Sequence, residues 1–208
     1  MEDRRAQVQQ QIEDDRVRQA VSHAYMQDMS KLLLEHNLAS READAVVREI
    51  ARSTTLSTVR QLDGARKGIL LRFLAGSNLI VNSAARQPSD PIILLRRADL
   101  SGADLRDADL SGTDLRDTDL RLADLSGTDL SRATLSRADL RDADLSCADL
   151  RDADLSFATV SNEQISGAKN RVGTLMPDGS EMTEEEFKEF EKHYQSESPD
   201  SPPRTPCS

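Results

Sequence analysis

A five-residue repeat in the middle of the chain limits what the chain can fold into. Leucine returns at every fifth position from Leu100 to Leu155. Aspartate or threonine precedes each of these leucines, and alanine or threonine stands two residues before it. Neither a helix of 3.6 residues per turn nor a strand with a side-chain period of two gives a strict period of five. The chain must therefore turn a corner once in every repeat.

The simplest structure with this property is a coil with flat sides, each side formed by one pentapeptide. The leucine and the small residue point inward, the other three residues face water, and backbone hydrogen bonds join stacked coils. Aspartate suits the corners because its carboxylate accepts hydrogen bonds from nearby backbone N–H groups. The predicted core ladder consists of Leu100, Leu105, Leu110, Leu115, Leu120, Leu125, Leu130, Leu135, Leu140, Leu145, Leu150 and Leu155. Val160 and Ile165 continue the spacing, which predicts fourteen repeats.

The stretch "ADLSGADLRDADL" at residues 98–110 resembles the pentapeptide-repeat family, whose motif is A(D/N)LXX. The resemblance implies a mainly β fold, a right-handed quadrilateral β-helix with four pentapeptides per turn, preceded here by an α-helical region. The flanking segments "YMQDMSKLLLEHNL" and "SNEQISGAKNRVGTLMPDGS" resemble those of a group of bacterial members. Many proteins of that group carry transmembrane helices upstream, so the chain resembles their soluble part.

Composition and patterning divide the chain into five predicted parts. Residues 1–85 form a helical cap or adaptor, and residues 86–97 form a linker with a degenerate first repeat, "IILL". Residues 98–167 form the solenoid. Residues 168–195 form a closing segment with a short helix, and the Pro- and Ser-rich tail 196–208 is predicted to be disordered.

Local signals predict the ends of several helices. Apolar periodicity favours helices over residues 17–38, 41–63 and 68–74, with Ser40 as the N-cap of the second. Two later pairs have the spacing of a capping box: Ser161 with Gln164, and Thr183 with Glu186. One short helix is therefore expected to begin after Ser161 and another after Thr183.

Charge and cysteine content narrow the choice of partners. The chain has a formal net charge of −10, and residues 96–160 hold nine basic and fifteen acidic side chains. An acidic surface repels phosphates, which predicts no direct nucleic-acid binding and favours a basic protein partner. Cys147 and Cys207 are the two cysteines and imply no disulfide framework. We predict a cytoplasmic monomer or homodimer without a membrane span, membrane-associated only if helices precede Met1.

No arrangement of residues in the sequence predicts catalysis. The histidines His23, His36 and His193 lie in separate segments without metal-ligand spacing. The sequence contains no Gly-rich phosphate loop before a helix and no nucleophile elbow. We therefore predict no enzymatic activity, no cofactor, no metal and no catalytic residues.

A column of aspartates is the first part of a candidate interaction surface. With four sides per coil, Asp99, Asp119 and Asp139 stack about 4.8 Å apart, the spacing of neighbouring strands. Such a column could hold cations. The favoured interpretation is that the carboxylates bond backbone N–H groups at the corners and are offset by nearby arginines.

Two outward apolar residues complete this candidate surface. Leu122 and Phe157 occupy positions that are polar or glycine in most repeats. Because an exposed Phe on a polar solenoid favours cover, we expect the C-terminal segment or the Phe187/Phe190 helix to pack over Phe157. If Phe157 is bare, a partner surface becomes the better explanation.

These observations favour a non-catalytic scaffold or protein–protein interaction module. Some family members imitate DNA on the surface of gyrase, which gives the alternative of an acidic mimic that inhibits or protects a DNA-binding enzyme. A rod of three and a half coils spans roughly 17 Å, over which duplex DNA carries about ten charges. The solenoid nets only −6 over all its sides, which disfavours mimicry. A third alternative is the cytosolic part of a membrane-tethered sensor or scaffold.

Overall fold

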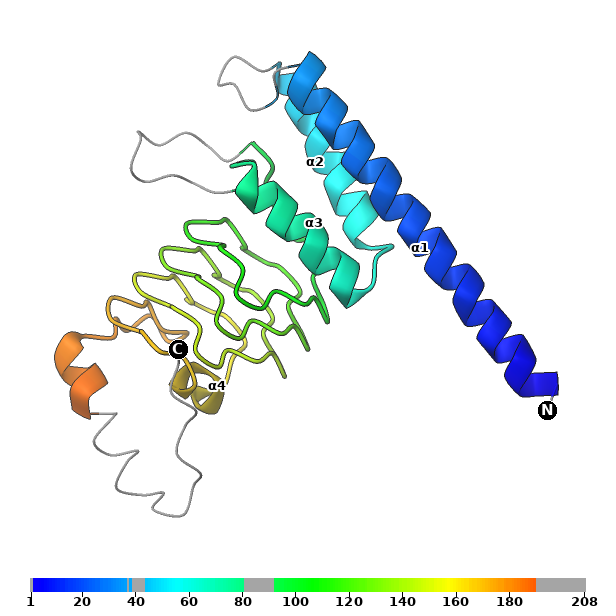
Figure 1. Ribbon diagram of the computed structural model, residues 1–208. Coiled ribbons are helices and arrows are strands. Elements are labelled where there is room, and N and C mark those ends of the chain that lie inside the picture. Colours follow the sequence, from blue (N-terminus) through cyan, green and yellow to red (C-terminus); the bar gives the residue numbers. More distant parts are fainter. Residues whose placement is uncertain (1, 37, 39–43, 81–91, 190–208) are drawn as a thin grey trace.

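The computed structural model describes residues 2–36, 38, 44–80 and 92–189. Helices form the N-terminal part and a stack of square coils forms the rest (Figure 1). The helices are α1 (Glu2–Glu35), α2 (Ala45–Val59), α3 (Gly64–Gly76) and α4 (Asn162–Ser166). Residues 184–189 are also helical. In Figure 1, α3 lies between the coils and the paired helices α1 and α2.

The N-terminal helices begin at different residues from those predicted. Helix α1 starts at Glu2 rather than near residue 17. The predicted cap Ser40 lies outside the described residues, and Asp44 caps α2 by accepting a hydrogen bond from the Val46 N–H. Asp63 caps α3 in the same way, so α3 begins four residues earlier than expected. Asp at an N-cap satisfies backbone N–H groups that have no partner inside the helix.

The leucines of the repeat lie inside the coils. All twelve leucines from Leu100 to Leu155 are at most 1% exposed. Leu95 is also fully buried, and the Arg97 N–H bonds the Arg116 carbonyl, so the coils begin within "IILL". Residues 86–91 of the predicted linker and the tail 196–208 lie outside the described residues.

Successive coils pair at a separation of twenty residues. Parallel bridges join Asp99 to Asp119 and Asp119 to Asp139, and the other sides show the same spacing. One coil therefore contains four pentapeptides. The Leu100 N–H donates to the Asp119 carbonyl over 2.8 Å, and the Asp119 N–H donates to the Ala98 carbonyl over 3.0 Å.

Pairing between coils does not extend into strands. Within the described residues, it consists of isolated bridges, and the regular elements are helices. This differs from the expectation of a mainly β chain. The reason is that each side turns after about two paired residues, and the residue two after each leucine has a positive φ, as at Leu122 (59°) and Phe157 (60°).

Helix α3 covers the open edge of the first coil. The Asp104 N–H donates to the Gly64 carbonyl over 2.9 Å. Lys67 is buried, and its ammonium group donates to the Ser101 carbonyl and the Asp99 carboxylate. The Arg72 guanidinium donates to the Asp104 carbonyl. These groups replace the preceding coil that the first coil lacks.

Helix α4 shifts the pairing register by one residue. Ile165 is buried, but it lies on α4 and not on a flat side of the coil. After α4, Asp149 pairs with Asn170 and Asp154 pairs with Leu175, a separation of twenty-one residues. The coils therefore continue to Leu175, beyond the predicted end at residue 167.

The side chain of Gln164 preserves the contact between coils at this insertion. By the register of the preceding coil, the Ala143 carbonyl faces residue 164. Here the Gln164 side-chain amide donates to both the Leu140 and Ala143 carbonyls over 2.7 Å. Its oxygen accepts from the Ser161 N–H, which confirms the predicted capping box.

A hairpin ends the coil path. Leu175 pairs antiparallel with Glu181, and the Met176 N–H donates to the Ser180 carbonyl. The predicted capping box of Thr183 and Glu186 is confirmed by their reciprocal hydrogen bonds. The chain thus leaves the coil after Pro177 and folds back on itself.

Across these described ranges, no helix is both long enough and apolar enough to cross a membrane.

Truncation of one ladder leucine should destabilise the coils strongly. Leu130 is fully buried, so Leu130→Ala should lower the unfolding free energy by about 2–5 kcal/mol through lost burial and a cavity. Leu122→Ala removes the same atoms from an exposed position and should change it by less than about 0.5 kcal/mol. Urea denaturation measures both variants, and equal effects would refute the assignment of the leucines to a common core.

The contact of α3 with the first coil should require glycine at position 68. A Cβ there would lie 1.8 Å from the Asp104 carbonyl oxygen, whereas a Cβ at Gly76 would meet nothing within 4 Å. Gly68→Ala should therefore lower the unfolding free energy by about 1–3 kcal/mol. Gly76→Ala, in the same helix, should leave it unchanged or raise it by up to about 1 kcal/mol. Thermal denaturation distinguishes these outcomes.

Candidate functional site

The residues of the predicted interaction surface lie on one side of the solenoid and at its two borders. We call it the Asp99 side: residues 98–102, 118–122, 138–142 and 158–160. Asp99, Asp119 and Asp139 are bridged in one column, which ends at Thr159. Leu122 lies at the corner that follows Leu120, and Phe157 at the corner that precedes Ala158. Sequence spacing therefore places the two apolar residues at opposite borders of the same side, two coils apart.

The carboxylates of the Asp99 side are bound by neighbouring groups. Asp99 accepts from the Ser101 N–H over 3.1 Å and from the Ser101 hydroxyl over 2.6 Å. Asp139 accepts from the N–H of Arg141 over 3.2 Å and from its guanidinium over 2.6 Å. Other columns repeat this arrangement, which confirms the predicted role of aspartate at the corners.

Arginines join aspartates of successive coils. The Arg121 guanidinium lies 2.6 Å from the Asp119 carboxylate and 3.8 Å from that of Asp139. On the next side, Arg106 lies 2.8 Å from Asp104 and 3.5 Å from Asp124. Negative charge is thus offset along the columns, as the favoured interpretation requires. Nowhere in the described ranges do three or more His, Cys, Asp or Glu residues form a group that could hold a metal ion.

These contacts lower the pKa values of several carboxyl groups. The hydrogen bond from the Arg106 guanidinium lowers the pKa of Asp104 to about 2. Hydrogen bonds from Arg121 and Arg141 lower the pKa of Asp119 and of Asp139, respectively. These aspartates are therefore ionised and already paired at neutral pH, which makes them poor candidates for proton transfer.

The expectation that the C-terminal segment covers Phe157 is wrong. Phe157 is 72% exposed and Leu122 is 69% exposed. Phe187 contacts Arg171 instead, whose guanidinium carbon lies 4.9 Å from the centre of the ring. Phe190 lies outside the described residues. The chain turns away at Pro177, so the segment that would have covered Phe157 folds back on the last coil.

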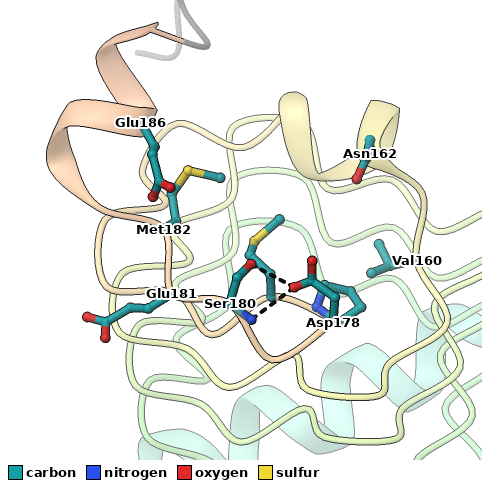
Figure 2. Close-up of a pocket in the computed structure, with 9 residues that line it drawn as sticks. Val160, Asn162, Asp178, Ser180, Glu181, Met182 and Glu186 are labelled. Carbon is teal, nitrogen blue, oxygen red and sulfur yellow. Dashed lines mark hydrogen bonds between the residues drawn. The ribbon is translucent and has the colours of Figure 1, made fainter.

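A cavity of about 350 Å³ opens at the C-terminal end of the Asp99 side. Figure 2 shows Met182 and Glu186 on one side of it and Val160, Asn162 and Asp178 on the other. The residues that line it are Val160, Asn162, Met176, Pro177, Asp178, Ser180, Glu181, Met182 and Glu186. A second hollow of about 440 Å³ shares Val160 with it and includes Arg141, Thr159 and Gln164. Sequence reasoning missed both, because the first depends on a hairpin and the second on the path into α4, and the five-residue period predicts neither.

The unfolding free energy should decrease as the pH falls from about 4 to about 2. Because the folded pKa values of Asp104, Asp119 and Asp139 lie below the unfolded value of about 3.9, the unfolded chain takes up protons first. This stabilisation is full above pH 3.9 and is lost as the pH falls through the folded pKa values. Urea denaturation at pH 7, 4 and 2.5 measures it. D104N/D119N/D139N should show a smaller decrease, and an identical decrease would contradict the assignment.

Comparison with known proteins identifies the repeat. Residues 94–121 and 118–156 match a family model described as "Pentapeptide repeats (8 copies)". No curated protein matches the sequence. Among solved structures, alr5209, a pentapeptide repeat protein from Nostoc PCC 7120, is similar with 41% identity and a TM-score of 0.32. The match covers 39% of this chain and 65% of alr5209.

Further solved structures show the same likeness. HetL from Nostoc sp. strain PCC 7120, a pentapeptide repeat protein involved in the regulation of heterocyst differentiation, has 34% identity, 46% coverage of each chain and a TM-score of 0.24. Rfr23 from Cyanothece 51142 has 31% identity over 43% of this chain and 67% of its own, with a TM-score of 0.23. This chain thus spans less than two thirds of alr5209 and of HetL. The matched repeats confirm the predicted resemblance, and the chain belongs to the pentapeptide-repeat family.

Proposed function

We propose that this chain is a non-catalytic scaffold that binds another protein through the Asp99 side. We also propose that its coils are the right-handed quadrilateral β-helix that the family resemblance implies. The parallel bridges at a separation of twenty residues support the second proposal, since they give four pentapeptides per coil.

The observation that carries the functional proposal is the exposure of two bulky apolar side chains, Leu122 (69%) and Phe157 (72%). Both lie at corners with a positive φ, a conformation that all corners of the repeat share, so the backbone does not require an apolar residue there. The equivalent corners of the same side hold Gly102 and Asp142. A bulky apolar side chain that is exposed contributes nothing to the core. Binding to a partner would remove both side chains from water.

The surroundings of these two side chains suit a protein interface. Leu122 and Phe157 stand two coils apart, or roughly 10 Å along the solenoid axis. Between them lie the ion pairs of Arg121 with Asp119 and of Arg141 with Asp139. Apolar contacts with fixed charged groups between them are typical of specific protein interfaces, in which the aromatic side chains supply much of the binding energy.

Pairing of the charges disfavours the alternative of an acidic DNA mimic. A mimic must present unpaired negative charge at the spacing of phosphates. On this solenoid, Arg106, Arg121 and Arg151 bind the aspartates of the columns.

The double variant F157S/L122S tests the scaffold proposal. It should leave the unfolding free energy within about 0.5 kcal/mol of the original value, because both side chains are exposed. It should also abolish recovery of the partner from lysate of the host on the immobilised chain, quantified by mass spectrometry. R132S/D152S is the matched control, since both residues have a positive φ at a corner away from the Asp99 side.

Two outcomes would contradict the proposal. Equal recovery of the same proteins by F157S/L122S and by the control would remove the two apolar residues from the interface. Inhibition of DNA gyrase supercoiling by the original chain at low concentration, unchanged in F157S/L122S, would instead favour the acidic mimic.

A further inference from the structure

The last coil leaves part of its backbone edge open. On each earlier coil of the Asp99 side, the leucine N–H donates to the next coil, as the Leu140 N–H does to the Thr159 carbonyl over 2.9 Å. The Ala138 carbonyl accepts from the Thr159 N–H in the same way. Within the described ranges, the equivalent Val160 N–H and Ala158 carbonyl take part in no such backbone bond.

The cause is the path of the chain after the last coil. The side that precedes Ala158 ends at Phe157, and it is still paired there, because the Phe157 N–H donates to the Pro177 carbonyl. The chain then turns through Gly179, whose φ is 85°, and Glu181 pairs back with Leu175. Had the coil continued, the next residues would have paired with Ala158 and Val160.

The 350 Å³ cavity lies beside this open edge. Val160 lines it together with Met176 and Met182, which supply an apolar surface. Asp178, Glu181 and Glu186 also line it, and none of the described residues that line it is basic. The apolar surface of the cavity suits an apolar side chain of a ligand, and its carboxylates attract a positively charged group.

We infer that this edge binds an extended basic peptide segment of a partner protein, which adds to the last coil as one more flat side. The inference rests on the proposed scaffold function and specifies the class of partner. The peptide backbone accepts from the Val160 N–H and donates to the Ala158 carbonyl. An apolar side chain enters the cavity, and lysine or arginine side chains bind the carboxylates of Asp178, Glu181 and Glu186. Addition of a strand to an open edge is a known mode of peptide recognition.

The C-terminal tail of this chain suits the edge poorly. Residues 190–208 contain four prolines, which have no N–H to donate. The same residues hold three acidic and two basic side chains, so their charge does not complement the cavity. A partner segment rich in lysine or arginine meets both requirements.

The experiment uses the full chain and a six-residue synthetic peptide that alternates lysine and valine, with blocked ends. Binding is measured by NMR titration at low salt, together with amide hydrogen exchange. We expect exchange of the Val160 N–H to slow at least tenfold at saturation. N-methylation of one alternate set of peptide amides should abolish binding and methylation of the other set should not, because alternate amides of a strand face opposite directions.

Neutral variants of the chain test the role of charge. D178N/E181Q/E186Q should weaken binding at least tenfold, while the amide oxygens can still accept the local hydrogen bonds that the carboxylates of Asp178 and Glu186 accept. The matched control E13Q/E185Q/E189Q removes three exposed carboxylates that do not line the cavity, and should bind as the original chain does.

Several outcomes would overturn the inference. The first is an unchanged exchange rate of the Val160 N–H when the lysine–valine peptide is added. The second is equally tight binding of a glutamate–valine peptide, or tighter binding of a synthetic peptide of residues 190–208, compared with the lysine–valine peptide. The third is dimerisation of the chain through this edge, measured by sedimentation. If the lysine–valine peptide fails while partner recovery still depends on Phe157 and Leu122, the scaffold function stands and only the inferred class of partner falls.

Discussion

Backbone hydrogen bonds between coils twenty residues apart are the interaction on which the rest of the structure depends. Within the repeat, a constant side length of five residues keeps these bonds in register and makes every leucine point to the same interior. Burial of the leucines and pairing of the backbone are therefore one constraint. Because each coil contacts only its neighbours, the constraint is local and can be repeated without change.

The ends of such a stack create the main physical difficulty, since a terminal coil exposes polar backbone groups. The first coil meets α3, where Gly64 and Gly68 allow the helix backbone to approach the coil edge closely. Within the stack, the amide of Gln164 replaces a backbone donor where α4 interrupts a side. The last coil is covered by a hairpin on one side only, and the edge at Val160 remains available for binding.

Two kinds of residue on the outer surface have different roles. Aspartates at the corners bind backbone N–H groups and arginines, so their charge serves the fold. Leu122 and Phe157 do neither, and both expose a large apolar side chain at corners that are polar or glycine in most repeats. Exposed apolar residues that do not stabilise the core are the ones from which a binding role is best inferred.

The repeat pattern was enough to predict the interior and the corners. A strict period of five requires the leucines to point inward and the aspartates to sit at turns, because these features depend on residues within one repeat. The capping boxes at Ser161 and Thr183 were predictable for the same reason. Three features became visible only in the folded chain: the one-residue register shift at α4, the exposure of Phe157, and the open edge with its acidic cavity. Each of these depends on where the chain goes after the repeat ends, and therefore on contacts between residues that no local pattern relates.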